Sequence, residues 1–352
     1  MLTYILCTLP HPLEGAASPE SKAGPVIGVM LGGFVYAYGT NLYMAAAAFF
    51  PPEAVLGLSV GSGCSVILGP GLYTGIMAGL DDDWRRTFLV LLPTVLGIPI
   101  VWWGVIDKSC RAAAEASRLN SSAKIRGGSS SSESEGSATN TDPSLRRRGS
   151  NPEEGNTNAS GGNQNSGFGS GRTRTGLLIK TLLPKYVLPL ILCTSSSIVT
   201  LLGTAPALQT LNRLQRAPEG NLQFQLVFLS YGTAQFLFSM ISALRPIPLV
   251  WIWTGVQITV MVIGLLQLAY PFLTYYGVWI VMLFLTGACV GGGVTNTNHK
   301  IAEDFRRAGE DDEVRSFAMS FAGLGNFGGD ALGGAFAILV EVLATRALAP
   351  SE

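Results

Sequence analysis

The sequence predicts an all-α polytopic membrane protein, a bundle of about eight transmembrane helices. Of its 352 residues, 48% are hydrophobic and 13% are charged, and the mean hydropathy is +0.37. Soluble domains carry roughly 25% charged residues, so charge is scarce here. No Asp, Glu, Lys or Arg occurs in residues 246–298. One span needs about 20 apolar residues, so this uncharged stretch alone is long enough for two spans and a turn.

Three spans are expected in a partial N-terminal transmembrane lobe, residues 1–106. They cover residues 24–50, 54–80 and 87–106. Pro51 and Pro52 end the first span, because proline does not continue a helix comfortably. Residues 1–10 are apolar but too short to cross a bilayer, and they lack the basic start of a signal peptide. They are interpreted as the tail of a further helix.

Residues 107–176 are different in composition and are predicted to be a disordered linker. They are rich in Ser, Gly, Asn and Arg and contain few aliphatic residues, so they cannot bury enough apolar surface to fold. Five further spans are expected in a C-terminal lobe, residues 177–352. These spans cover residues 186–208, 224–244, 249–270, 278–297 and 317–344.

The distribution of basic residues predicts the orientation. Many Lys and Arg residues lie in the linker and its flanks, and basic loops stay cytosolic, so the linker is expected to face the cytosol. Counting spans outward places the loop expected at residues 301–315 in the cytosol and the C-terminus in the lumen. Arg213 and Arg216 conflict with this pattern, since they fall in a lumenal loop.

Composition also argues against several classes of function. The formal net charge is zero, so no global field attracts nucleic acid. The five cysteines are scattered without a CxxC pair and only two histidines occur, which predicts no zinc cluster and no disulfide framework. No catalytic group of nucleophile, base and stabiliser assembles, and no Walker A motif occurs. We therefore expect no enzyme, no metal and no cofactor.

Polar residues inside the spans are the candidates for function, because an ionisable group is costly in a bilayer. Asp330 lies near the middle of the last span, and Asn326 lies one turn earlier on the same helix face. The carboxyl is either a proton-coupling or substrate-cation site, or a group hydrogen-bonded to a neighbouring helix. Asn296 and His299 lie at the end of the preceding span. His299 suits proton sensing or is a helix cap or surface residue.

Glycines recur at a spacing of four residues in several spans, as at Gly287 and Gly291 and at Gly325, Gly329 and Gly333. Such rows let helix backbones approach closely. They also suit transporter helices that move past one another.

Two segments carry a resemblance to a known family. Residues 294–302 read V-T-N-T-N-H-K-I-A, and residues 311–319 read D-D-E-V-R-S-F-A-M. Together they resemble the C-terminal signature of the battenin family. The motif Y-V-L-P-L at residues 186–190, F-L-S-Y-G at residues 228–232 and G-S-G at residues 61–63 are similar to further family segments.

The resemblance implies a major-facilitator-like helical bundle in the vacuolar, lysosome-like membrane. It implies roles in vacuolar pH homeostasis and in the transport of basic amino acids or other small lysosomal solutes. The family has more spans before the linker, so an incomplete N-terminal lobe is expected here. Asn326 stands at the family's acidic position in the last span, with Asp330 one turn later.

Two functions follow as hypotheses. The first is a vacuolar transporter for a small solute, with or without protons, whose path is lined by Asp330, Asn326, Asn296 and His299. The second is a membrane regulator or scaffold of vacuolar pH and trafficking that does not transport. It would bind cytosolic protein partners through residues 107–176 and the loop that follows Lys300. The bilayer is the partner common to both.

Overall fold

The computed structural model describes two long stretches of the chain. They are residues 23–101 without Pro51, Asp81 and Asp82, and residues 179–348 without Glu219, Gly220, Pro248 and Asp311, with a few separate positions from 103 to 115 and Gly176. Nearly every element in these stretches is a helix, and their β pairing is one isolated bridge between Gln215 and Tyr275. The all-α prediction is confirmed. Residues 1–22 and most of the expected linker lie outside the described residues.

Six helices in the described part of the chain are long and apolar enough to cross a membrane. They are Val55–Gly79, Ile179–Thr210, Leu222–Leu244, Val250–Ala269, Tyr276–Arg307 and Glu313–Ala347. Helix α2, Ala23–Ala47, has 25 residues and is about 37 Å long at 1.5 Å per residue, which also exceeds the hydrocarbon core of about 30 Å. These helices make the chain a polytopic membrane protein.

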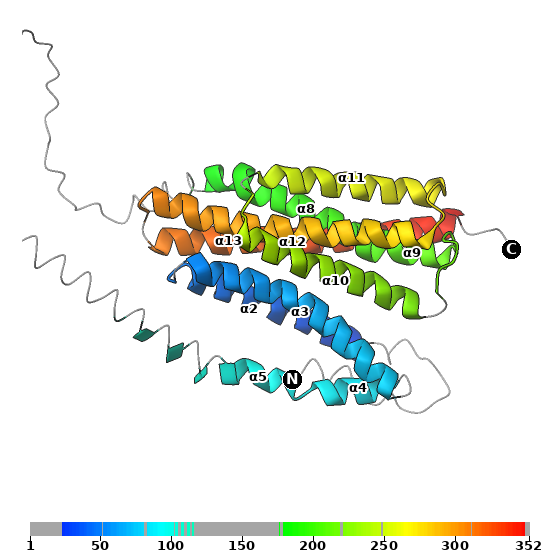
Figure 1. The fold of residues 1–352 in the computed structure, drawn as a ribbon, viewed down its shortest axis with the longest axis horizontal. Coiled ribbons are helices and arrows are strands. Elements are labelled where there is room, and N and C mark those ends of the chain that lie inside the picture. The colour runs from blue at the N-terminus through cyan, green and yellow to red at the C-terminus, as the bar shows by residue number, and fades with distance from the viewer. Residues whose placement is uncertain are drawn as a thin grey trace, which may run out of the picture. The chain divides into compact units, whose positions relative to one another are not determined.

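Helices α2 and α3, Pro52–Gly79, form a hairpin that corresponds to the first two expected spans (Figure 1). Pro52 is the first residue of α3, a position where the missing N–H of proline costs nothing. Helix α2 packs on α13, Asp312–Leu348, and α3 packs mainly on α10, Asn221–Leu244. The hairpin is therefore joined to the helices that follow the linker.

The third expected span, residues 87–106, is not one continuous helix. The structure has two eight-residue helices here, α4 (Trp84–Leu91) and α5 (Thr94–Val101). A turn at Leu92 and Pro93 separates them. The Pro93 ring and its missing N–H break the helical hydrogen bonds at this point. The prediction of one continuous span relied on the apolar composition of the stretch and did not take this break into account.

The span expected at residues 186–208 is part of a longer helical run that contains two π-helical segments. It comprises η3 (Leu183–Val187), α8 (Leu188–Ile198), η4 (Val199–Thr204) and α9 (Ala205–Thr210). The η segments are π-helical, a form that appears mostly as single-turn bulges in α-helices and often at functional sites.

The last three helices are α11 (Val250–Ala269), α12 (Tyr276–Arg307) and α13. The expected loop at residues 301–315 is wrong in extent, because α12 continues to Arg307 and α13 begins at Asp312. Gly309 takes a φ of +68° in the short turn between them, a conformation that glycine adopts without steric cost. At about 48 Å, α12 is longer than the hydrocarbon core is thick.

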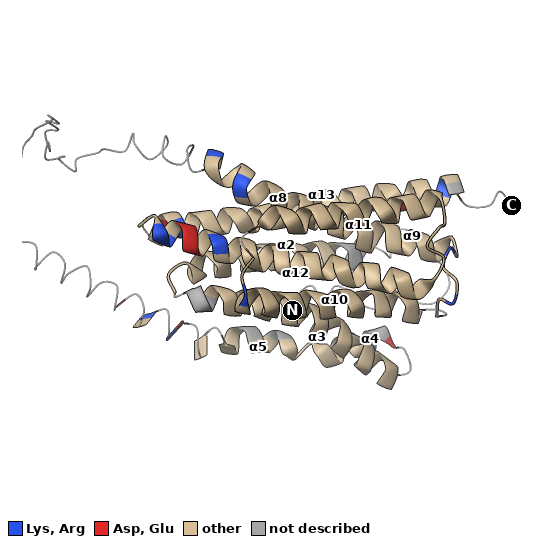
Figure 2. Cartoon of the chain, turned by 45° about the horizontal axis from the view of Figure 1, so that its top comes forward, with Lys and Arg blue, Asp and Glu red and all other residues tan. Residues whose placement is uncertain are grey.

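Charged residues gather where the helices end (Figure 2). One group surrounds the turn between α12 and α13, which we call the α12–α13 end of the bundle. The α9–α10 end is the opposite end, around residues 211–218. The sequence predicts that the α12–α13 end is cytosolic.

Glycines bring helix backbones into direct contact in the interior. A Cβ on Gly291 would lie 2.9 Å from the Cα of Gln235, and a Cβ on Gly287 would lie 2.9 Å from the carbonyl carbon of Tyr231. Helices α10 and α12 therefore touch backbone to backbone. The close-packing interpretation of these glycines is correct, and their role in helix movement remains a prediction.

Candidate functional site

Asp330 lies in the middle of α13, and a row of glycines sets the direction in which it faces. Cβ atoms on Gly329 and Gly333 would lie 3.0 Å from the Cα of Ile191 and 2.9 Å from the Cα of Ser195. These glycines hold α13 against α8. Asp330 follows Gly329 by one position, so its side chain is turned away from that seam by about 100°.

The Asp330 carboxylate lies near tyrosines of two other helices. It is within electrostatic reach of Tyr36 on α2 and of Tyr231 on α10. Tyr36 lies beside Ser62 of α3, and Tyr231 lies beside Ser197 of α8. Five helices thus contribute to one polar group around a partly buried carboxylate. Among the described residues, Asp330 makes no ion pair or side-chain hydrogen bond.

Asn326 shares this face of α13 with Asp330, as expected from their spacing. Its side-chain Oδ1 is shielded from solvent and has no hydrogen-bond partner, while its backbone oxygen accepts a bond of 3.3 Å from the Thr194 hydroxyl. Next to it, the rings of Phe327 and Tyr36 meet edge to face at 5.5 Å. The structure therefore brings Asp330 and Asn326 together beside α2.

Asn296 occupies a different place and is fully engaged. Its Nδ2 donates to the Ser242 hydroxyl at 2.9 Å and to the Gly292 oxygen at 2.7 Å, and its Oδ1 accepts from the Ile247 N–H at 2.5 Å. These bonds fix the segment between α10 and α11 against α12. Asn296 has little capacity left for a solute.

His299 lines a cavity of about 250 Å³ at the α12–α13 end. The cavity is bordered by Pro246, Ile247, Asn296, His299, Lys300, Glu303, Asp304 and Arg307. Its acidic groups have partners: Glu303 pairs with Arg307 at 2.8 Å and Asp304 with Lys185 at 2.9 Å. Tyr186 also donates a hydrogen bond to Asp304. The cavity thus has paired charges on its wall and a histidine at its edge.

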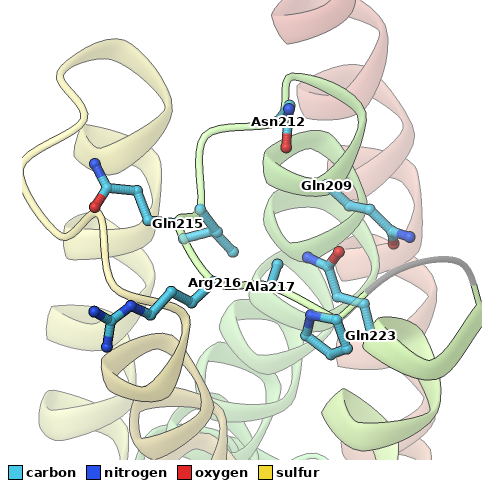
Figure 3. Close-up of a pocket in the computed structure, with 8 residues that line it drawn as sticks. Gln209, Asn212, Gln215, Arg216, Ala217 and Gln223 are labelled. Atoms are coloured by element: carbon cyan, nitrogen blue, oxygen red, sulfur yellow. The ribbon is translucent and has the colours of Figure 1, made fainter.

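A larger cavity of about 670 Å³ opens at the α9–α10 end (Figure 3). The amides of Gln209, Asn212 and Gln223 border it, together with the stem of Arg216. Arg216 has a φ of +57° and places its guanidinium 5.7 Å from the centre of the Tyr275 ring. Arg216 thus makes a cation–π contact in the loop where its charge conflicts with the expected orientation.

The four residues predicted from sequence therefore divide between two places. Asp330 and Asn326 face α2 within the bundle, whereas Asn296 and His299 border the cavity at the α12–α13 end. Sequence reasoning missed Tyr36, Tyr231 and Ser62 as neighbours of Asp330. Two signals were available, because Ser62 and Tyr231 lie within segments that carry the family resemblance.

Within the described stretches, no group of three or more His, Cys, Asp and Glu side chains is placed to hold a metal ion. Cys193 and Cys289 are buried free cysteines, and the Cys193 thiol lies 3.8 Å from the Cys289 backbone oxygen.

Long apolar helices with a carboxylate inside the last of them define a polytopic helical membrane protein. A family model described as CLN3 protein matches residues 16–346, so the chain belongs to this family. The match confirms the resemblance to battenins and supports a protein of the lysosomal or vacuolar membrane. A comparison with curated protein sequences gave no match.

Proposed function

We propose that this chain is a secondary transporter of the vacuolar or lysosomal membrane. Its path runs between the α2–α3 hairpin and the helices that follow the linker. The observation that carries the proposal is the Asp330 carboxylate, which lies inside a membrane helix, lacks a partner among the described residues and is within electrostatic reach of Tyr36 of the hairpin. Intramembrane carboxylates mark ion and substrate pathways.

The arrangement suits a proton- or cation-coupled path. Asp330 and Asn326 line its middle, and His299 lies in the cavity at the α12–α13 end. Asn296 holds the wall of that cavity through its three hydrogen bonds. We propose a major-facilitator-like arrangement of the helices, with basic amino acids or other small lysosomal solutes as cargo and a contribution to vacuolar pH.

The test is solute uptake into vesicles that contain the full chain. Asp330→Asn is expected to abolish proton-coupled uptake while leaving insertion and expression intact, because Asn is similar in size but does not ionise. Glu341→Gln is the matched control. It removes a carboxylate from the same helix, near its C-terminal end and away from both described cavities, and should preserve most uptake. Uptake that survives Asp330→Asn unchanged excludes this carboxylate as the coupling group.

A second candidate is a regulator or scaffold of vacuolar pH and trafficking that does not transport. It is favoured by the charged surface at the α12–α13 end, where Arg306 and Arg307 are exposed (Figure 2). This function predicts that deletion of residues 107–176 removes the effect on vacuolar pH. A deletion without effect would count against it.

A further inference from the structure

The cavity at the α9–α10 end is set between the end of α9 and the first turn of α10. Gln209 and Asn212 border it from the side of α9, and Gln223 borders it from α10. In Figure 3 the Gln223 amide is directed toward the end of α9. The volume of about 670 Å³ lies within the range of roughly 300–1,000 Å³ that is usual for small-molecule sites. Polar groups from two helices therefore surround a space large enough for a small solute.

Hydrogen bonds to the start of α12 hold this end of the bundle in place. The Gln215 N–H donates to the Thr274 oxygen at 2.6 Å, and the Tyr276 N–H donates to the Gln215 oxygen at 3.2 Å. The Tyr276 hydroxyl donates to the Gln223 backbone oxygen at 3.0 Å. The segment between α9 and α10 and the start of α10 are thus both fixed. The cavity is therefore formed before a ligand arrives, which lowers the entropic cost of binding.

The charge of the cavity comes from arginine. Among the described residues that line the cavity, Arg216 is the charged one, and Arg213 lies three positions earlier in the same segment. Neither arginine pairs with a carboxylate in the stretches that the structure describes. A cleft whose charge has one sign attracts ligands of the opposite sign. The lining therefore favours an anion.

The same two arginines depart from the usual distribution of basic residues. The sequence predicts that this end of the bundle is lumenal, and Lys and Arg are less frequent in loops on that side. Arginine stays protonated at every physiological pH, so its charge persists in an acidic compartment as well. An anion site at this end gives Arg213 and Arg216 a function that membrane orientation does not provide.

The Arg216 side chain is placed to reach a ligand in the cavity. Its stem borders the cavity (Figure 3), whereas its guanidinium lies 5.7 Å from the centre of the Tyr275 ring. A cation–π contact at an exposed ring is weaker than charge-assisted hydrogen bonds to a carboxylate. Because Arg216 is exposed, its side chain can change rotamer within nanoseconds. The guanidinium can therefore turn from the ring to a bound carboxylate, which its planar group of N–H donors matches in geometry.

We infer that this cavity binds a small hydroxylated carboxylate, such as a sugar acid, with Arg216 pairing with the carboxylate and the neighbouring amides contacting the hydroxyl groups. These amides are those of Gln209, Asn212 and Gln223. A carboxamide carries donors and an acceptor, as a hydroxyl group does, so the two groups match in either direction. The inference does not rest on the transport proposal, because the site lies at the end of the bundle and does not involve Asp330.

Equilibrium dialysis of the purified full chain in detergent against radiolabelled gluconate tests the site. Gluconate carries a carboxylate on a chain of hydroxylated carbons, and sorbitol has the same carbon chain without the carboxylate. Ionic strength is kept constant, because salt screens the attraction between charges. We expect saturable binding of gluconate, and sorbitol should displace it at least about tenfold less effectively than unlabelled gluconate does. Butyrate, a carboxylate without hydroxyl groups, should also displace it less effectively.

Three outcomes of the dialysis overturn the inference. The first is the absence of saturable gluconate binding. The second is displacement by sorbitol that equals displacement by gluconate, since it would indicate a site for neutral polyols. The third is displacement by inorganic phosphate that exceeds displacement by gluconate, since it would indicate a phosphate site.

Variants of the two arginines locate the charge that binds the ligand. Arg216→Gln should weaken gluconate binding by about tenfold or more. Arg216→Lys keeps the charge but loses the planar group of donors, so its affinity should lie between those of Arg216→Gln and the unaltered chain. Arg213→Gln is the matched control, because it removes the same charge from the same segment at a residue that does not line the cavity. It should change the dissociation constant by less than about twofold. Equal weakening in Arg213→Gln and Arg216→Gln would indicate a diffuse effect of charge and overturn the site.

Gln223→Leu tests the contribution of the amides. It should weaken the binding of gluconate and leave the displacement of gluconate by butyrate, relative to its own gluconate affinity, more effective than in the unaltered chain. The reason is that gluconate has hydroxyl groups for the Gln223 amide to contact and butyrate has none. Unchanged gluconate affinity in Gln223→Leu overturns the assignment of a hydroxylated ligand.

Discussion

Replacing Asn296 with alanine distinguishes a structural role from a role in the solute path. The substitution removes three hydrogen bonds, to Ser242, to Gly292 and from the backbone N–H of Ile247. Hydrogen bonds of side chains between membrane helices contribute about 0.6 kcal/mol each on average. A backbone N–H left without a partner costs about 1–3 kcal/mol. We expect Asn296→Ala to lower the free energy of unfolding by about 2–3 kcal/mol.

The assay is reversible unfolding of the purified chain in mixed micelles by titration with a denaturing detergent. Asn298→Ala is the matched control. Asn298 lies two positions further on the same helix and, like Asn296, is 2% exposed, but its Nδ2 has no partner. Asn298→Ala should lower the free energy of unfolding by less than about 1 kcal/mol, because the truncation removes a group that has no hydrogen-bond partner. Equal losses in the two variants would refute the reasoning, as would a loss below about 0.5 kcal/mol in Asn296→Ala.

Two further predictions concern packing and a loop. Gly291→Ala should lower the free energy of unfolding by about 1–3 kcal/mol, because its new methyl group overlaps the α10 backbone. Gly255 has open space around it, so Gly255→Ala should leave the free energy of unfolding unchanged or raise it slightly. Equal effects in these two variants, measured in the same micelles, would contradict the contact. Gln267→Leu should lower the free energy of unfolding by about 2 kcal/mol and increase hydrogen exchange of the α11–α12 loop. The buried Gln267 amide donates to the Leu273 backbone oxygen at 2.8 Å and accepts hydrogen bonds from two loop N–H groups. Unchanged exchange in that loop would contradict this role.

The apolar spans could be predicted because the bilayer imposes a minimum length and excludes charge. The hairpin α2–α3 and the helices from α10 to α13 lie close to the expected ranges. The end of α12 could not be predicted in the same way. Glu303 and Arg307 are four residues apart and form an ion pair on one helix face, but a polar sequence of this kind is also typical of a loop.

From residue chemistry alone, the candidate site was predictable only where a residue carried a charge or a polar group that is costly to place inside the bilayer. Asp330 was found because a carboxylate in a span needs an explanation. Tyr36 carries no such signal, since tyrosine is common in membrane helices as an apolar body with one polar atom. Tyr231 is marked only by its place in the family-like segment at residues 228–232. Asn296 was predicted as part of the path, but its partners, Ser242 and Ile247, lie about 50 positions earlier. Helix pairing rather than local sequence determines its role.

The direct backbone contact of α10 with α12 restricts how the protein can change shape. At Gly287 and Gly291 the backbone of α10 lies directly against α12, so these two helices cannot slide past each other without separating first, and we expect them to move as one rigid body. A hinge must lie elsewhere, and the π-helical turns that flank α8 are the places where the backbone hydrogen bonding is already irregular. Spectroscopic probes on α10 and α12 should therefore keep a constant separation during the proposed transport cycle. Probes on α2 and α11 should report the motion.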